Sequence, residues 1–465
     1  MELLSKKIKI VFFIKLLTLL ISTPVLSSDG GLTPQMIEKI RSSFEMDTHT
    51  RAMYNAITNN DIAGLALNRD IVRGHNELFS HKIKTKGITN QKSSGRCWIF
   101  ATLNAIRPAV IEKHNLESFE LSQNYLAFWD KVEKANLFLE RMIEFRKTDL
   151  FDRYMVRMLR APLPDGGYWS NAVDLIKKYG LVPKEIMPET NSSENTKLMN
   201  RVIGQKLRAD AVKLRKMHQE NKTIEQLRAE KEKMVGEVYR MLVINLGEPP
   251  SEFQWRFEDA NSELSEMTTY TPKSFFEEFV GVDLDEYADV SNDTIRNYGL
   301  HCQGKMSRGM YEGRDIDYAN VGIETLRNIA MKSILDDTPV YFSSDSGCDN
   351  SKKLGIMEDG LYDYDSVYKT DMKMTKREQA LYRNSKRSHG MALTGVDGQN
   401  GKAVKWLVEN SWGKEKGSKG YWSIYDKWFE ENIYSIIVKK KYIPEEILKI
   451  YEKPPVILEP WDPML

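Results

Sequence analysis

The sequence predicts an α+β fold in which helices dominate the first part of the chain and strands dominate the last part. Residues 195–246 are highly charged, contain no proline and have scattered apolar residues, which is typical of one or two long solvent-facing helices. From Val340 onward, short apolar and aromatic runs alternate with turns, which is typical of strands. We therefore expect a helical region followed by a β-rich region.

The individual elements follow from local patterns along the chain. Thr33 and Pro34 open a helical stretch that extends to residue 76. Residues 87–96 are polar and turn-rich, and Cys97 then opens an apolar run that we interpret as a buried helix ending near Pro108. Further helices are predicted over residues 121–139 and 151–159, before a loop at 162–167. Strands are predicted at 340–343, 391–396, 404–410, 420–424 and 434–438.

The N-terminus has the pattern of a secretory signal peptide. Three lysines in the first nine residues precede the apolar run from Ile10 to Ile21, and small residues follow as far as Ser28. We expect residues 1–27 to be removed and the protein to be exported, to the periplasm or the medium. The alternative is an amphipathic or disordered extension on a cytoplasmic protein. The run is too short to span a membrane, and no later segment is long and apolar enough to do so.

Charge and cysteine content exclude several classes of protein. The 67 basic and 66 acidic residues give a net charge of +1, which argues against nucleic acid as a partner. Glutamates interleave with the basic residues around Lys206 to Lys233, as on a solvated helix face. Three cysteines are too few for a disulfide scaffold. We expect Cys302 and Cys348 to be core residues, although in an exported protein they could pair and leave Cys97 free.

Cys97 is the predicted nucleophile. A thiol attacks a peptide carbonyl as a thiolate, and a helix N-terminus or an adjacent imidazolium favours that form. Cys97 stands at a predicted loop-to-helix junction, where unpaired backbone N–H groups favour negative charge. Gln91, six residues earlier, could donate its amide to the developing oxyanion beside the backbone N–H of Cys97.

His389 is the predicted base. It lies between Ser388 and Gly390 at the start of a predicted strand, and residues 410–413 read Asn-Ser-Trp-Gly at the end of another. The Asn410 oxygen could accept the second imidazole N–H and orient the ring, and Trp412 could shield that bond from water. Other catalytic signatures, such as G-x-S-x-G and H-E-x-x-H, are absent, and no metal or cofactor is expected.

Together these motifs resemble the papain superfamily, and within it the bleomycin hydrolase or aminopeptidase C family. His389 follows Cys97 by 292 residues (389 − 97), against about 130–150 in papain itself, so extra chain must lie between the two halves of the site. Further marks of that branch lie within the segments 89–98, 121–126, 165–167, 178–183 and 460–464. The resemblance covers roughly residue 43 to the C-terminus.

The resemblance implies a papain-like two-lobed fold with a helical lobe carrying the Cys, a β-rich lobe carrying the His and Asn, and a large helical insertion. We place the N-terminal part of the core at residues 28–190, the helical insertion at 191–300 and the β-rich part at 301–465. The family also implies peptide substrates, aminopeptidase activity and a homohexameric ring. Its catalytic set corresponds to Gln91, Cys97, His389 and Asn410.

Two substrate-binding features are also implied by the resemblance. Gly166 and Gly167 would lie along the cleft, where missing side chains allow a substrate backbone to approach, and the alternative is a plain turn. The proline-rich tail would enter the cleft, anchored by Trp461, and the terminal carboxylate of Leu465 would pair with the substrate's α-ammonium group. The alternative is a tail that packs on the surface or at a subunit contact.

Two other functions remain open at this stage. A papain-like endopeptidase would share the same catalytic residues, and would be favoured if the short tail left the cleft open. An oligomeric scaffold or nucleic-acid-binding ring would use the basic helices instead, but the intact catalytic set and the near-zero net charge argue against it.

Overall fold

The computed structural model describes residues 30–465, so the predicted signal peptide at 1–27 lies outside the described residues. The chain divides into two compact units. One comprises the part up to Leu67 together with Tyr364–Thr370, and it contains the helices α2 (Pro34–Ser43), α3 (Thr48–Ile57), α4 (Ile62–Ala66) and α15 (Tyr364–Tyr368). In this unit the Oγ of Thr33 caps α2 by accepting the backbone N–H of Met36.

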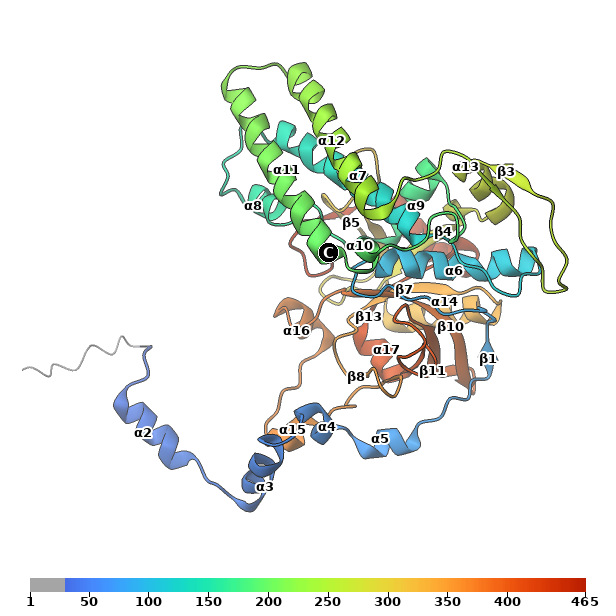
Figure 1. Cartoon of the computed structure of the whole chain (residues 1–465). Coiled ribbons are helices and arrows are strands. Elements are labelled where there is room, and N and C mark those ends of the chain that lie inside the picture. The colour runs from blue at the N-terminus through green and yellow to red at the C-terminus, as the bar shows by residue number, and fades with distance from the viewer. Residues whose placement is uncertain (1–29) are drawn as a thin grey trace, which may run out of the picture. The chain divides into compact units, whose positions relative to one another are not determined.

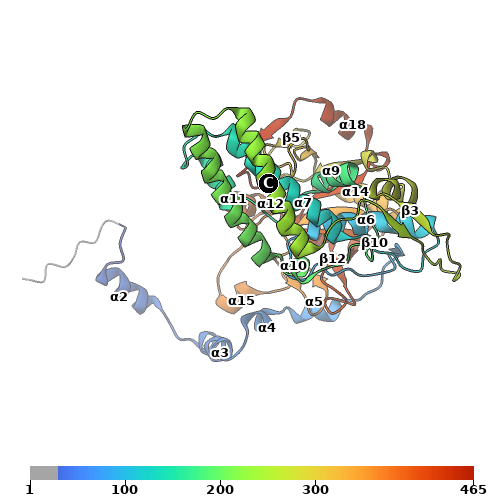
Figure 2. The same cartoon turned by 45° about the horizontal axis from the view of Figure 1, so that its top comes forward.

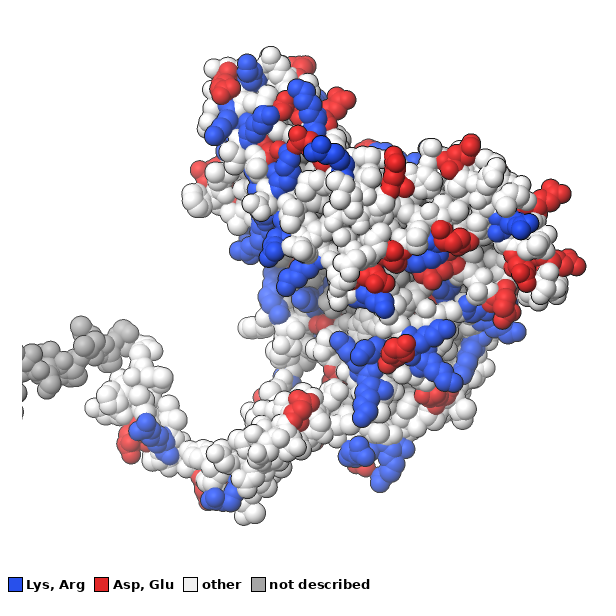
Figure 3. Space-filling view, viewed as in Figure 1, with Lys and Arg blue, Asp and Glu red and all other residues white. Residues whose placement is uncertain are grey.

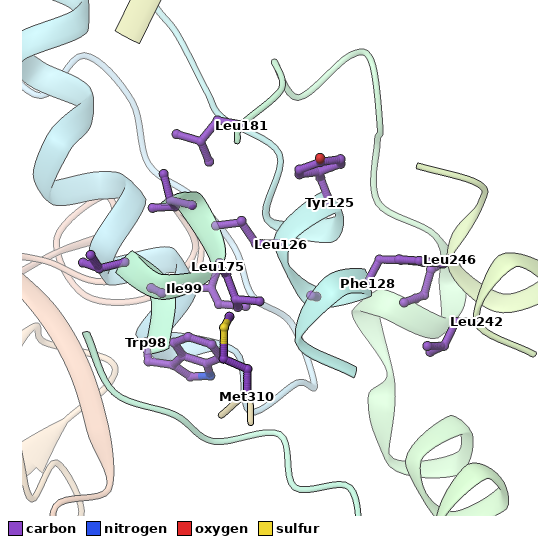
Figure 4. Packing of buried hydrophobic residues seen from close by; sticks show 14 of the residues in the cluster. Trp98, Ile99, Tyr125, Leu126, Phe128, Leu175, Leu181, Leu242, Leu246 and Met310 are labelled. Carbon is purple, nitrogen blue, oxygen red and sulfur yellow. The ribbon is translucent and has the colours of Figure 1, made fainter. Parts of the chain in front are cut away.

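The second unit comprises Asn68–Asp363 and Asp371–Leu465 and contains the predicted site. Its helical lobe is built from α6 (Cys97–Lys113), α7 (Gln123–Glu144), α8 (Arg153–Arg160), α9 (Trp169–Tyr179), α10 (Asn191–Glu194), α11 (Thr196–Gln219) and α12 (Ile224–Leu246). The short helix α5 (Arg69–Gly74) lies beside the β-rich lobe, where His75 Nδ1 is 3.0 Å from the Tyr425 hydroxyl (Figure 1). Figure 4 shows side chains of α6, α7, α9 and α12 packing into one apolar core. None of the helices within residues 30–465 is long and apolar enough to cross a membrane.

Helix α6 forms the centre of this lobe and is buried along almost its whole length. The sequence predicts that this helix ends near Pro108, but it continues to Lys113. Val110 and Ile111 are fully or almost fully buried beyond the proline, so their burial favours another turn of helix despite the hydrogen bond that proline cannot donate.

The charged stretch forms the antiparallel hairpin of α11 and α12, which lie side by side in both views (Figures 1 and 2). Apolar residues at helical spacing, including Leu207 and Leu214, bury one face of α11 while its charged residues face outward. The long helices of the predicted insertion at 191–300 therefore end at Leu246, and short strands and short helical turns follow. The remainder of the insertion includes β2 (Phe253–Trp255), β3 (Thr268–Tyr270), α13 (Pro272–Ser274), η1 (Phe275–Val280) and η2 (Leu284–Glu286). The predicted boundaries at residues 190 and 300 stay predictions.

In the described part of the chain, twelve strands form one mixed sheet in which β1 pairs with β10 and the others follow the order β14-β5-β6-β4-β13-β7-β10-β11-β12-β9-β8. The strands are β1 (His81–Lys82), β4 (Tyr287–Ser291), β5 (His301–Gly304), β6 (Asp317–Asn320), β7 (Val340–Ser344), β8 (Asn350–Ser351), β9 (Ile356–Met357), β10 (His389–Gln399), β11 (Lys402–Glu409), β12 (Tyr421–Tyr425), β13 (Ile433–Lys439) and β14 (Val456–Leu458). All five predicted strands are confirmed. Strand β4, inside the predicted insertion, pairs with β13 and is part of the sheet.

The remaining short elements pack against this sheet: α14 (Ile323–Leu335), α16 (Lys376–Leu381), α17 (Asp426–Asn432), η3 (Lys440–Tyr442), α18 (Glu445–Leu448) and η4 (Lys449–Glu452). A second apolar core lies beneath them, around Trp406, Trp422 and Trp428. The three cysteines are free thiols, so Cys302 and Cys348 do not pair. Cys302 is a core residue as predicted, whereas Cys348 is only partly buried.

Candidate active site

Cys97 is the first residue of α6, as the sequence predicts. The turn before it is held by Asp165, whose carboxylate accepts the backbone N–H of Gly95 at 2.9 Å. A Cβ on Gly95 would lie 2.7 Å from the Cβ of Asp165, so glycine is needed here for close packing within the protein. Arg96 adds a buried ion pair with Glu189 at 2.8 Å. The nucleophile loop is therefore fixed by contacts below it.

Asp165 links this loop to two helices of the helical lobe. It accepts hydrogen bonds from Lys131 on α7 at 2.7 Å, and from Thr196 and Asn200 on α11 at 2.5 and 2.7 Å. Burial by itself would raise the pKa of the Asp165 carboxyl, but the Lys131 ammonium and the hydrogen bonds hold that pKa below its usual value. The carboxylate is thus charged and fully bonded beneath the turn that carries Cys97.

His389 begins β10, and Asn410 directly follows the neighbouring strand β11. The Nε2 atom of His389 lies 2.9 Å from the Oδ1 atom of Asn410. That same oxygen accepts the backbone N–H of Ser411 at 2.8 Å, which fixes Oδ1 as the acceptor side of the amide. Nε2 is therefore the protonated nitrogen, and Nδ1 of His389 is left to accept a proton.

Trp412 lies against the His389 ring, while its predicted shielding of the His389–Asn410 hydrogen bond stays a prediction. Its ring stacks on the His389 imidazole with 4.8 Å between ring centroids and 24° between planes. Trp422 packs edge-on against the other side of Trp412, at 5.4 Å. The imidazole is consequently held both by a hydrogen bond in its plane and by an aromatic face above it.

Gln91 is brought to the site by a short antiparallel pairing between the segment 89–91 and the segment 411–413. The backbone N–H of Gln91 donates to the carbonyl of Ser411 at 2.8 Å, and the Ser411 hydroxyl donates to Oε1 of Gln91 at 2.7 Å. The Gln91 amide nitrogen donates one hydrogen to the carbonyl of Ser94 at 2.6 Å. Its second hydrogen has no partner within residues 30–465, so it is available to a ligand.

A cavity of about 1040 Å³ brings most of the predicted site residues together. Its lining includes the predicted residues Gln91, Cys97, Gly166, Gly167, His389, Trp412 and Leu465. Asn410 is fully buried and lies behind His389, outside that lining. Seven of the eight predicted residues therefore border one cavity, and the eighth supports it.

The two glycines line the cleft, but for different reasons. A Cβ on Gly167 would lie 2.7 Å from the Trp98 ring, so packing alone demands glycine there. A Cβ on Gly166 would meet nothing within 4 Å. The Gly166 carbonyl accepts a hydrogen bond from the Lys134 ammonium at 2.7 Å. Both glycines line the cavity, and their predicted role beside a substrate backbone stays a prediction.

The C-terminal tail ends at the same cavity. Arg387 donates to the carbonyl of Met464 at 3.3 Å, and Arg296 forms an ion pair with Asp462. The guanidinium carbon of Arg153 lies 3.8 Å from the centroid of the Trp461 ring. Trp461 is the residue that the sequence predicts to anchor the tail. Met464 is almost completely buried. The tail therefore packs inside the fold, with Leu465 at the edge of the cavity.

Burial opposes charge on both reacting groups. It raises the pKa of the Cys97 thiol, although the backbone N–H groups of Gly390, Trp98 and Cys97 itself oppose that rise. It lowers the pKa of the His389 imidazole to about 4; the Asn410 hydrogen bond opposes this effect and the Lys352 ammonium adds to it. Neither charge is favoured alone, but proton transfer from Cys97 to His389 would create an ion pair whose attraction offsets part of the desolvation cost.

Three residues of the site were not predicted from the sequence. Ser411 orients Gln91, and its position within the Asn-Ser-Trp-Gly segment is the signal that could have indicated this. Asp165 supports the nucleophile turn, and its place before two glycines was the available signal. Lys352 lies over the Trp412 ring, with 4.8 Å between its ammonium and the ring centroid. No sequence pattern marks that lysine.

Comparison with known proteins identifies the family of this chain. The model of the Peptidase C1-like family matches residues 31–465. An aminopeptidase C of Listeria monocytogenes is 39% identical over 389 residues, which is 83% of this chain and 88% of that protein. A bleomycin hydrolase of Mus musculus is 35% identical over 450 residues, covering 94% and 99% of the two chains.

Among solved structures, the crystal structure of PepW from Lactobacillus rhamnosis matches with a TM-score of 0.90 and 37% identity. The match covers 94% of this chain and 99% of that one, so the likeness extends over almost the whole of both chains. It also confirms the predicted papain-like α+β architecture. This chain therefore belongs to the Peptidase C1-like family and is a cysteine peptidase.

Proposed function

We propose that this protein is a thiol aminopeptidase that removes N-terminal residues from peptides through a Cys97 thioacyl-enzyme. The observation that carries the proposal is the position of the chain terminus, because Leu465 lines the same cavity as Cys97 and His389. The relatives named aminopeptidase C support the same activity.

The geometry supplies a role for each catalytic residue. Cys97 gives its proton to Nδ1 of His389 as its sulfur attacks the carbonyl carbon, forming a C–S bond and a tetrahedral oxyanion. The free N–H of Gln91 and the backbone N–H of Cys97 donate to that oxyanion. Asn410 holds the Nε2–H of the resulting imidazolium.

The second half of the reaction reverses these proton transfers. His389 returns its proton to the leaving amine as the C–N bond breaks, leaving a thioester on Cys97. A water molecule then attacks the thioester carbon while His389 takes its proton. The C–S bond breaks, the acid is released, and the proton on His389 returns to the Cys97 sulfur or remains as the thiolate–imidazolium pair.

The tail supplies the exopeptidase preference. The terminal carboxylate of Leu465 has no ion-pair partner within 4.0 Å among the residues that the structure describes, so it is available to a substrate's α-ammonium group. A peptide extending further toward its own N-terminus would have to displace Leu465, whose segment is held by Arg387 and Arg296. Substrates with a free N-terminal residue at the cleavage position avoid this displacement.

A comparison of two fluorogenic substrates tests the proposal. A free-amine aminoacyl amide should be hydrolysed with a higher kcat/KM than the same compound acylated on its nitrogen, since blocking removes the ammonium and adds bulk against Leu465. Equal kcat/KM values for the two would favour an endopeptidase of the same fold, which is the second function that this site allows.

Location and assembly are further parts of the proposal. The Lys-rich start and apolar run at residues 1–27 support export with removal of that segment, and N-terminal sequencing of the native protein tests it. The family resemblance supports a homohexamer, which light scattering of the purified protein tests. A cytosolic protein that retains residues 1–27, or a monomer, would contradict these two parts respectively.

A further inference from the structure

The cavity that holds Cys97 is strongly basic, although the chain as a whole is nearly neutral. Its lining contains nine Lys or Arg residues and a single acidic side chain, that of Asp345. Figure 3 shows Lys and Arg gathering beside a recess between α11 and α16. The net charge of the whole chain is only +1. The balance of charge in the cleft therefore differs from that of the rest of the molecule.

Most of these cations form no ion pair with a carboxylate of the described residues. Lys134, Lys305 and Arg387 lie within 4.0 Å of Asp130, Glu459 and Asp289 respectively. The other six have no such ion pair within residues 30–465: Arg141, Arg157, Arg160, Arg308, Lys352 and Lys386. Unpaired cations at the wall of a cleft produce a positive potential that attracts anionic ligands.

The one acidic side chain does not offset this potential effectively. Asp345 is only 5% exposed, and its carboxylate oxygens accept the backbone N–H groups of Gly347 at 3.0 Å and Lys386 at 3.2 Å. Its charge is thus directed into the loop that it stabilises. The terminal carboxylate of Leu465 is reserved for the substrate's α-ammonium group in the proposed function.

Lys352 lies on the side of the cleft where the leaving group departs. The leaving amine must face His389, because the imidazole donates the proton that releases it. Trp412 stacks on His389, and the Lys352 ammonium lies 4.8 Å from the Trp412 ring centroid. The part of a peptide that follows the scissile bond therefore runs past Trp412 toward Lys352.

Lys386 borders the same region from another segment. It lies three residues before His389, and its backbone N–H donates to Asp345, whose other oxygen also lies within 3.5 Å of the Ser388 hydroxyl. The side chains of Lys352 and Lys386 are both exposed, so each ammonium can move to meet a ligand. Both lysines thus line the cavity that contains Cys97 and His389.

We infer that the leaving-group side of this cleft selects peptides with an Asp or Glu side chain at the first or second position after the scissile bond. The inference rests on the proposed function, since it names the substrate class of the same site. The group that is recognised is a carboxylate. A short peptide also carries a carboxylate at its own C-terminus. Lys352 and Lys386 are the residues that bind it. Each exposed ion pair should change kcat/KM by about two- to fivefold.

The test uses the full chain and two tripeptide amides that differ only in charge, Ala-Glu-Ala-amide and Ala-Gln-Ala-amide. The kcat/KM ratio of the Glu peptide to the Gln peptide should exceed 1, and should fall as ionic strength rises to about 0.5 M because salt screens the attraction. Lys352→Met should lower the ratio about two- to fivefold, and the double variant with Lys386→Met should bring it close to 1. Lys353→Met is the matched control, since Lys353 is exposed in the same loop but does not line the cavity.

Each alternative outcome has a definite meaning. A ratio near 1 in the unaltered protein, with the Gln peptide turned over, would overturn the inference and leave the aminopeptidase proposal intact. If Lys352→Met lowers kcat/KM equally for both peptides, the lysine acts through His389 and not on the substrate's charge, which also overturns it. A preference seen only between free-acid and amidated dipeptides would contradict the assignment to a side chain. Failure to cleave any free-amine peptide would instead refute the proposed function.

Discussion

Replacing Asn410 by alanine is the sharpest test of the site, because its effects on stability and on activity can be worked out separately. Asn410 is fully buried, and its Oδ1 accepts from His389 and from the backbone N–H of Ser411. Alanine would leave two buried donors without a partner, at about 1–3 kcal/mol each. Its Nδ2 has no partner among the described residues, so losing it recovers a similar amount. We therefore expect a net loss of about 1–3 kcal/mol in the free energy of unfolding.

The catalytic effect of Asn410→Ala should be smaller than the effect of losing the base. A hydrogen bond to a charged imidazolium is worth about 1.5–3 kcal/mol, which corresponds to a drop of about 10- to 100-fold in kcat. Trp412 still stacks on the ring after the substitution, so the imidazole keeps its approximate plane. His389→Ala removes the base altogether and should lower kcat much further.

The assay combines urea unfolding with kcat on a free-amine aminoacyl substrate. Asn124→Ala is the matched control, because Asn124 is equally buried, donates to the carbonyls of Pro188 and Leu246, and does not line the cavity. It should lower stability by a similar amount and leave kcat within about twofold. Unchanged kcat in Asn410→Ala, or an equal loss of kcat in both variants, would refute an orienting role for Asn410.

Three further outcomes follow from the same geometry. Cys97→Ala should abolish turnover while preserving the fold, and iodoacetamide should label Cys97 of the unaltered protein ahead of Cys348; residual turnover or equal labelling would contradict the nucleophile assignment. Burial lowers the pKa of His389 from an ordinary 6.5 to about 4 in the folded state. Between pH 6.5 and pH 4 the unfolded state therefore binds more protons than the folded state. The free energy of unfolding should fall by up to about 3 kcal/mol as the pH drops over this range. His389→Gln should flatten that slope in urea unfolding, whereas an unchanged slope would show that other groups carry it. Removing residues 459–465 should raise the activity on N-blocked peptides relative to free-amine ones, and an unchanged ratio at the same oligomeric state would show that the tail does not restrict the cleft.

Several elements were predictable because their signals are local. The apolar run after Cys97 marks a buried helix wherever the chain places it, and alternating apolar residues mark the strands that carry His389 and precede Asn410. The end of α6 was predicted wrongly, since the burial of Val110 and Ile111 outweighs the local effect of Pro108. The prediction of a helical insertion over residues 191–300 included the strand β4. That strand forms by pairing with β13, far along the chain, so local sequence did not indicate it.

The sequence by itself determined which residue types could perform the chemistry, and the family resemblance added the order in which they occur. Only the tertiary structure decided which of them meet. Gln91 and Ser411 are brought together by pairing between distant segments. Lys352 lies over Trp412 in the loop before β9, and β9 is fixed by its pairing with β12. Such contacts depend on strand order and loop closure, which periodicity does not encode. The protonation of Cys97 and His389 also depends on burial, which exists only once the two lobes enclose the cleft.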